Sequence, residues 1–141
     1  MKKYTQADFD AFEVIDGIKQ CPSGDYSAIQ VFSESCSFGE ECSFGERCSF
    51  GRCCSFGERC SFEGKGEYIG DYPFLAFVGF GSRIGSKVYF FNLQDGIYVR
   101  CGCWLSNIAG FRERVKEKNA DAMYLDLCDL VERKFNRKNS K

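Results

Sequence analysis

The chain has 141 residues, which is long enough for one compact unit with a buried core. Its 20 acidic and 19 basic residues leave a formal net charge of −1, which argues against a general nucleic-acid-binding protein. It contains no histidine, so the commonest general base and a frequent zinc ligand are both excluded. We expect one unit made of an N-terminal cap over residues 1–31, a repeat over 32–85 and a C-terminal module over 86–141.

The first 31 residues are predicted to cap the repeat that follows them. Thr5 with Asp8 three residues later is typical of the start of a short helix. The dipeptide Asp16-Gly17 stands between two short apolar runs and predicts a two-residue β-hairpin. A cap is needed here because the open end of a stacked β-structure is an unpaired strand edge.

Residues 32–61 carry a repeat of six residues. The repeated residues are Phe at positions 32, 38, 44, 50 and 56, and Cys at positions 36, 42, 48, 54 and 60. Six is an even spacing, so Phe and Cys all fall on one face of an extended chain and are predicted to point inward. The recurring Gly after Phe marks either a corner or a close approach to another backbone. The pattern predicts a mainly β fold, a left-handed parallel β-helix of about three coils, with three hexapeptides in each coil.

In such a coil, residues 18 positions apart stack about 4.8 Å apart. The predicted aromatic columns are Phe38-Phe56-Phe74, Phe32-Phe50-Tyr68 and Phe44-Phe62-Phe80. Outside, Glu34 would pair with Arg52 and Glu41 with Arg59, whereas Glu40 over Glu58 is a like-charged pair that counts against this register. Another solenoid of period six or an irregular β-roll are the alternative architectures.

A second hairpin and a helix are predicted after the repeat. Residues 87–93 and 96–103 alternate apolar and polar side chains on either side of a turn at 94–96. Ser106 or Asn107 can cap a helix that runs to about residue 118. Its buried face is expected to consist of Ile108, Phe111 and Val115.

A second helix is predicted over residues 120–135. Its apolar stripe is expected to contain Met123, Leu127, Leu130 and Val131. Trp104 and the apolar run at 73–80 also need cover, and a thin solenoid can bury little. We therefore expect a homo-oligomer, a dimer or a trimer, and favour a symmetric dimer through the C-terminal module.

The ten cysteines are interpreted as reduced thiols. The Lys-rich start is followed by no apolar run and no stretch is long enough to span a membrane, so a cytoplasmic protein without membrane contact is expected. Cys101-x-Cys103 and the Cys-x5-Cys spacing do not match zinc sites, so no metal and no other cofactor is expected. Cys53 occupies an outward position and is either a reactive thiol or, as we favour, an inert surface thiol.

The hexapeptide block resembles the left-handed β-helix superfamily, which includes trimeric acyltransferases and γ-class carbonic anhydrases. Those enzymes generally use His as a general base or as zinc ligands, and this chain has none. Other segments look like small proteins of phages and prophages of gut bacteria. These segments are Cys-Pro-Ser-Gly-Asp-Tyr at 21–26, the Cys-Ser-Phe-Gly repeats and Gly-Ile-Tyr-Val-Arg-Cys-Gly-Cys at 96–103. This second resemblance covers most of the chain and implies the cytoplasm of a bacterial host.

These observations predict a non-enzymatic protein-binding module without catalytic residues. In the context that the resemblance implies, it would be a phage-encoded inhibitor of host machinery such as a CRISPR effector, with a host protein or complex as partner. Residues 34–71 carry eight acids against four bases, and an acidic face could mimic nucleic acid. The candidate interaction surface consists of Glu40, Glu41, Glu46, Glu58 and Trp104. The alternatives are a virion structural or assembly protein, and a divergent acyltransferase-fold enzyme without the usual His.

Overall fold

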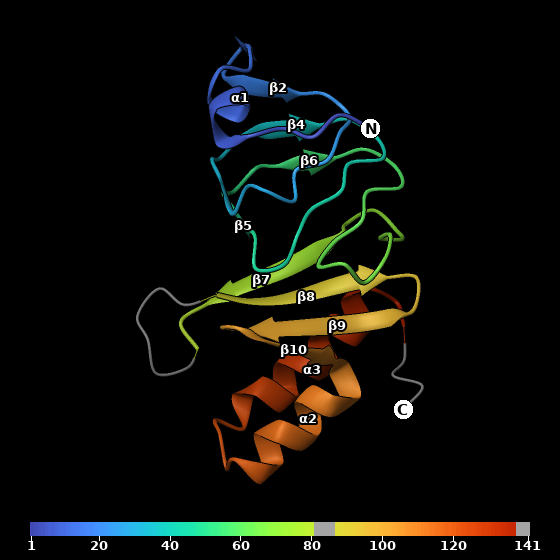
Figure 1. The fold of residues 1–141 in the computed structure, drawn as a ribbon. Coiled ribbons are helices and arrows are strands. Elements are labelled where there is room, and N and C mark those ends of the chain that lie inside the picture. Colours follow the sequence, from blue (N-terminus) through green and yellow to red (C-terminus); the bar gives the residue numbers. More distant parts are fainter. Residues whose placement is uncertain (81–86, 138–141) are drawn as a thin grey trace. The chain divides into compact units, whose positions relative to one another are not determined.

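The computed structural model describes residues 1–80 and 87–137 and divides the chain into two compact units, Met1–Tyr68 and Ile69–Lys141 (Figure 1). The first unit contains α1 (Gln6–Asp10), β1 (Val14–Ile15), β2 (Ile18–Cys21), β3 (Val31–Phe32), β4 (Cys36–Phe38), β5 (Ser49–Phe50) and β6 (Ser55–Phe56). The second contains β7 (Phe74–Val78), β8 (Lys87–Leu93), β9 (Gly96–Cys101), β10 (Trp104–Asn107), α2 (Ile108–Glu117) and α3 (Met123–Lys134).

The N-terminal part of the first unit forms the predicted local structures. Thr5 and Asp8 make a capping box at the start of α1, in which each side chain accepts a hydrogen bond from the other residue's backbone N–H. β1 and β2 form an antiparallel hairpin. Its turn residues Asp16 and Gly17 have φ values of 52° and 80°, as a two-residue hairpin turn requires.

The repeat pairs in parallel with a spacing of 18 residues. Phe32 of β3 lies opposite Phe50 of β5, and Phe38 of β4 lies opposite Phe56 of β6. The stacked rings are nearly parallel, with centroids 5.0 Å apart in the first pair and 5.2 Å apart in the second. Phe44 stacks on Phe62 at 5.1 Å in the same way. The first two members of each predicted aromatic column are therefore in contact, and rings of successive repeats meet edge to face.

The glycines after Phe are required by close packing. A Cβ on Gly51 would lie 2.5 Å from the backbone nitrogen of Glu34, and one on Gly57 would lie 2.6 Å from that of Glu40. The chain bends instead at the residue before each repeat Cys, where the backbone is left-handed although no glycine is present. These residues are Ser35, Glu41, Arg47, Cys53 and Arg59, with φ values between 58° and 63°. Of the two roles that the sequence allowed for these glycines, the structure assigns close approach to another backbone.

The predicted fold class is wrong. In place of a mainly parallel left-handed β-helix of about three coils, the described residues form a mixed sheet in the order β1-β2-β4-β6, a short parallel pair β3-β5, an antiparallel sheet in the order β10-β9-β8-β7, and three helices. The repeat ends at a turn over residues 62–66, where the Phe62 N–H donates to the Gly66 carbonyl at 3.0 Å. The expected last corner at Gly85 falls outside the described residues.

The chain leaves the repeat because residues beyond Phe62 lack its packing features. Glu63 stands where the repeat has Gly, and Gly66 stands where it has Cys. Of the three aromatic residues expected to continue the columns, Tyr68 stays against the end of the repeat, with its ring 6.1 Å from that of Phe62, and the other two pack elsewhere. Phe74 lies edge-on to Phe91 in the antiparallel sheet, with centroids 5.6 Å apart, and Phe80 lies against Tyr124 at 5.7 Å.

In the second unit, α2 and α3 cover one face of the antiparallel sheet (Figure 1). The hairpin β8–β9 and helix α2 agree with the sequence prediction, and Asn107 is the N-cap whose Oδ1 accepts a hydrogen bond from the Gly110 N–H at 2.8 Å. Strand β10 was not predicted. It pairs with β9 from Trp104, opposite Cys101, onward.

The predicted apolar stripe of α3 is only half correct. Leu127 and Val131 are buried, but Met123 and Leu130 are 52% and 44% exposed. The helix buries Tyr124 and Cys128 in their place. These four buried residues follow helical spacing, so the error lay in the choice of face. No helix in residues 1–80 and 87–137 is long and apolar enough to cross a bilayer.

Candidate functional site

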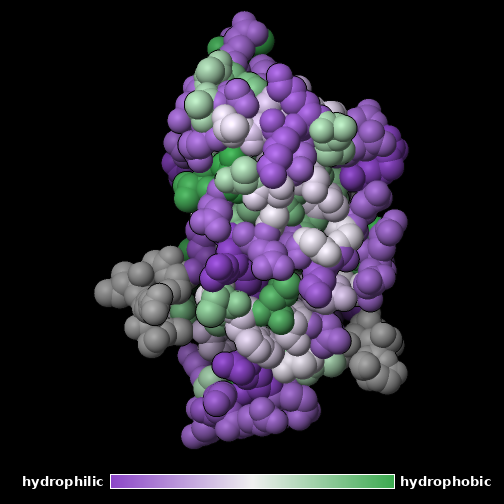
Figure 2. Space-filling model, viewed as in Figure 1, coloured by the Kyte–Doolittle hydropathy of each residue, from purple (hydrophilic) through white to green (hydrophobic). Residues whose placement is uncertain are grey.

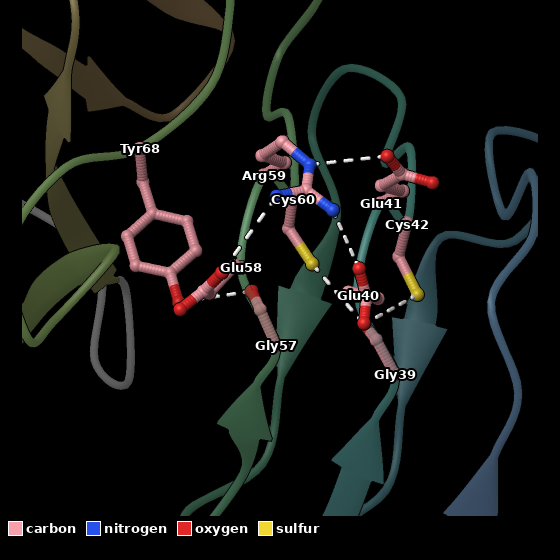
Figure 3. A network of polar contacts seen from close by, with 9 residues as sticks. All are labelled: Gly39, Glu40, Glu41, Cys42, Gly57, Glu58, Arg59, Cys60 and Tyr68. Carbon is pink, nitrogen blue, oxygen red and sulfur yellow. Dashed lines mark hydrogen bonds and ion pairs between the residues drawn. The ribbon is translucent and has the colours of Figure 1, made fainter.

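Three of the predicted glutamates surround one arginine in the first unit. Arg59 Nε donates to Glu41 Oε2 at 3.0 Å, Nη2 contacts Glu40, and Nη1 lies 3.7 Å from Glu58 (Figure 3). The hydrogen bond to Glu41, with the other carboxylates, raises the pKa of Arg59. Arg59 thus offsets the like-charge contact that the register predicts for Glu40 and Glu58. All four side chains are exposed, so the pairs add little to stability.

A second arginine of this unit also pairs with a glutamate. Arg52 Nε donates to Glu34 Oε1 at 3.1 Å, which is the predicted pair across 18 residues. Glu46 is exposed and lies in a different repeat from Glu40 and Glu58. The face drawn in Figure 2 is mostly hydrophilic, with hydrophobic residues in separate small areas. Three of the four predicted glutamates, Glu40, Glu41 and Glu58, therefore share one arginine in a local ion-pair cluster.

The repeat cysteines hydrogen-bond to backbone carbonyls inside the first unit. The thiols of Cys36, Cys42 and Cys48 each donate to the carbonyl three residues earlier, at 3.2, 3.1 and 3.2 Å. Cys60 donates to the Gly39 carbonyl at 3.4 Å (Figure 3). These four cysteines are buried, whereas Cys54 is half-buried. A small thiol fits here because it fills core volume and also satisfies a carbonyl at the bend.

Short exposure to iodoacetamide at neutral pH is expected to modify Cys53 and Cys103, which are exposed, and to spare Cys42. The thiolate is the reacting species, and the neighbouring Cys60 sulfur together with burial raises the pKa of Cys42. Burial, with the nearby carboxylates of Glu132 and Asp129, raises the pKa of Cys128 to about 12. Mass spectrometry of peptides would locate the label, with an unfolded sample as the control. Equal labelling of Cys42 and Cys53, or disulfide-bonded pairs among the repeat cysteines, would contradict this prediction.

Trp104, the fifth predicted surface residue, lines a groove in the second unit. The groove has a volume of about 530 Å³ and is formed by the ends of β9 and β10, by α2, by the α2–α3 connection and by the start of α3. Its lining residues are Cys101, Trp104, Phe111, Arg114, Val115, Lys118, Ala120, Asp121 and Tyr124. This volume lies within the range of sites that bind a ligand or an anchoring side chain.

The groove has an apolar floor. Phe111, Val115 and Tyr124 are each at most 6% exposed and belong to the core of this unit. The Phe111 ring centroid lies 5.5 Å from that of Tyr124 and 6.1 Å from that of Trp104. Burial, with the nearby Cys101 and Asp121, raises the pKa of Tyr124 to about 12, so its hydroxyl stays protonated at neutral pH.

The groove has a polar rim with two cations and one acid. The Arg114 guanidinium lies 4.6 Å from the centroid of the Trp104 ring. Lys118, the C-cap residue of α2, is exposed one helical turn further on. Asp121 accepts a hydrogen bond from the Met123 N–H at 2.9 Å and so helps to start α3.

Trp104 and the predicted glutamates belong to different units. Trp104 is part of Ile69–Lys141, whereas the glutamates are part of Met1–Tyr68. The sequence did not predict that Arg114, Lys118 and Tyr124 line a site with Trp104. The signal present was the spacing of Arg114 and Lys118, which places both on one side of a helix. In the part of the chain that the structure describes, no group of three or more Cys, Asp or Glu side chains is arranged to hold a metal ion.

Comparisons with protein-family models, with curated proteins and with solved structures gave no match to this chain.

Proposed function

We propose that this chain is a non-enzymatic protein-binding module and that the groove at Trp104 is its contact site. The observation that carries the proposal is an open apolar groove of about 530 Å³ with an aromatic side chain at its edge. Tryptophan, tyrosine and arginine are the residues most enriched among those that dominate binding energy in protein interfaces. Trp104, Tyr124 and Arg114 all line this one groove.

The same proposal includes the partner that the sequence resemblance implies, a protein or complex of a bacterial host. That resemblance supports the biological setting and the groove supports the mode of contact. The acidic residues of the first unit are a weaker candidate contact because Arg59 and Arg52 pair with four of them. A mimic of nucleic acid would need a row of unpaired negative charges.

The test is to block the groove without disturbing the core. Ala120 is exposed and lines the groove, so Ala120→Tyr would fill the opening. Ala122 is exposed two residues away and is not a lining residue, so Ala122→Tyr is the matched control. Each variant would be immobilised and incubated with bacterial lysate, and retained proteins would be identified by mass spectrometry. We expect Ala120→Tyr to lose a protein that the wild type and Ala122→Tyr both retain, and equal retention by all three would contradict the proposal.

Self-association through the C-terminal module stays a prediction. Met123 and Leu130 are exposed apolar residues seven positions apart, so they lie on the same side of α3. A symmetric dimer would cover them. Light scattering at micromolar concentration should give the mass of a dimer, and Leu130→Glu should shift it to a monomer. A monomeric wild type would rule the dimer out.

A further inference from the structure

We infer that the groove at Trp104 accepts an acidic peptide segment of a partner protein, with one large apolar side chain as its anchor. This inference rests on the proposed function and names the chemistry of the partner. It follows from three features of the groove, which are its apolar floor, the charge of its rim and the arrangement of the two cations along α2.

The floor selects an apolar anchor. Phe111 and Val115 from α2 and Tyr124 from α3 form it, and all three are buried. A polar side chain placed against this floor would lose its hydrogen bonds to water without gaining new hydrogen bonds from the protein. A large aliphatic or aromatic side chain would instead contact Trp104 and Phe111 together, because these two rings lie 6.1 Å apart and tilted to one another.

The rim selects negative charge beside that anchor. Arg114 and Lys118 are four positions apart on α2, so their side chains are neighbours and repel each other. Carboxylates of a bound segment would relieve that repulsion. Asp121 is the single acid of the lining and already accepts a hydrogen bond from the Met123 N–H, so it neutralises only part of the rim.

The position of the cations is not explained by α2 alone. A helix C-terminus favours basic residues, which accounts for their presence in the last turns of α2. That effect does not depend on the side of the helix. Lys116 lies in the same last turn but does not line the groove, whereas Arg114 and Lys118 both do.

A nucleic acid fits this surface less well than an acidic peptide. Nucleic-acid sites carry a stripe of basic residues that follows the phosphates. The groove offers two cations beside an acid, and the whole chain has a net charge of −1. An apolar floor also suits one inserted side chain better than a run of stacked bases.

The test uses the full chain and its own fluorescence. Trp104 is the only tryptophan in the sequence, so its emission reports on this groove alone. The probes are three peptides free of tryptophan with the anchor Phe-Leu in the middle: Asp-Glu-Phe-Leu-Asp-Glu, Asn-Gln-Phe-Leu-Asn-Gln and Lys-Lys-Phe-Leu-Lys-Lys. A fourth peptide, Asp-Glu-Ala-Ala-Asp-Glu, lacks the anchor, and an oligothymidylate is the nucleic-acid probe.

We expect the acidic anchored peptide to change Trp104 emission saturably and to bind about tenfold more tightly than the neutral one, since two rim charge pairs form. Added salt should reduce that difference. The peptide without the anchor should bind more weakly than the acidic anchored peptide. Lys118→Glu should abolish the preference for the acidic peptide, whereas Lys116→Glu, the same charge change in the same turn, should leave it intact.

The contrary outcomes separate this inference from the proposed function. If the neutral or basic anchored peptide binds as tightly as the acidic one, the groove binds protein but the stated partner chemistry is wrong. If the oligothymidylate binds more tightly than every peptide, the partner is a nucleic acid and both statements fail. If no probe changes the emission up to about millimolar concentration and Ala120→Tyr retains every wild-type partner, the groove is not a binding site.

Discussion

Replacing Phe50 with alanine is expected to lower the free energy of unfolding by about 3–5 kcal/mol. Phe50 is 3% exposed, and its ring stacks on Phe32 at 5.0 Å. It also meets Phe44 and Phe56 edge to face, with centroids 5.1 and 5.2 Å away. Removing the ring therefore deletes buried apolar area and leaves a cavity among rings that are held by their own stacks.

Chemical denaturation followed by circular dichroism would measure this loss. Val31→Ala is the control, because Val31 belongs to β3 in the same unit but is 66% exposed. It should change the stability by less than about 0.5 kcal/mol. An unchanged unfolding midpoint for Phe50→Ala would show that the aromatic rings do not form the core of the first unit.

Replacing Gly51 with alanine is expected to cause the second large loss of stability, although the substitution adds only one methyl group. The added Cβ would lie 2.5 Å from the nitrogen and 2.7 Å from the Cα of Glu34, both backbone atoms of the neighbouring stacked segment. Backbone atoms cannot move aside as a side chain can, so the parallel pairing of β3 with β5 must open. We expect a loss of about 2–3 kcal/mol, at the upper end of overpacking effects.

Gly39→Ala provides the matched control for Gly51→Ala, because Gly39 has the same place in its repeat. Its Cβ would lie 3.0 Å from the Ser23 hydroxyl and 3.1 Å from the Ser23 nitrogen, which is tight but tolerable after a small shift. Thermal unfolding of the two variants should therefore show a much larger loss for Gly51→Ala. Similar losses would show that the shorter distance to the backbone of Glu34 does not determine the cost at Gly51.

Local features of this chain were predictable because short-range chemistry determines them. Asp16-Gly17 specifies its hairpin, and Thr5 and Asn107 cap helices with their own side chains. The six-residue period likewise predicts which rings stack, since Phe32 meets Phe50 at the expected spacing. Each of these statements depends on residues that are close in sequence or related by the repeat.

The extent of the repeat was not predictable in the same way. Phe74 fits the six-residue period, yet its strand β7 pairs antiparallel with β8. Phe74 joins the antiparallel sheet because residues 87–93 form a strand that pairs with it, and the six-residue period contains no information about that strand. The prediction of the buried face of α3 failed for a related reason, because Tyr124 is buried by contacts with Phe80 and Phe111 from other segments.

The candidate site was visible only in part. Trp104 stood out as a large apolar residue without an assigned place, but its neighbours in the groove come from α2 and α3. The apolar spacing of α2 indicates only its buried side, formed by Ile108, Phe111 and Val115, and gives no role to Arg114 and Lys118. A groove is formed by side chains from several elements together, whereas hydrophobic periodicity describes only one helix or strand at a time.

The left-handed residues before each repeat Cys have a consequence for how this protein can change. Four of these five positions are exposed, and they hold Glu, Arg and Cys although Asn or Gly would adopt that backbone at lower cost. Their identities are thus not dictated by folding. Single substitutions can accumulate at these positions without loss of the fold. A change to Asn or Gly at any of them should be tolerated or should stabilise the protein. Diversity in a population of such proteins should therefore concentrate at these positions, while Phe and Gly of the same repeats stay fixed.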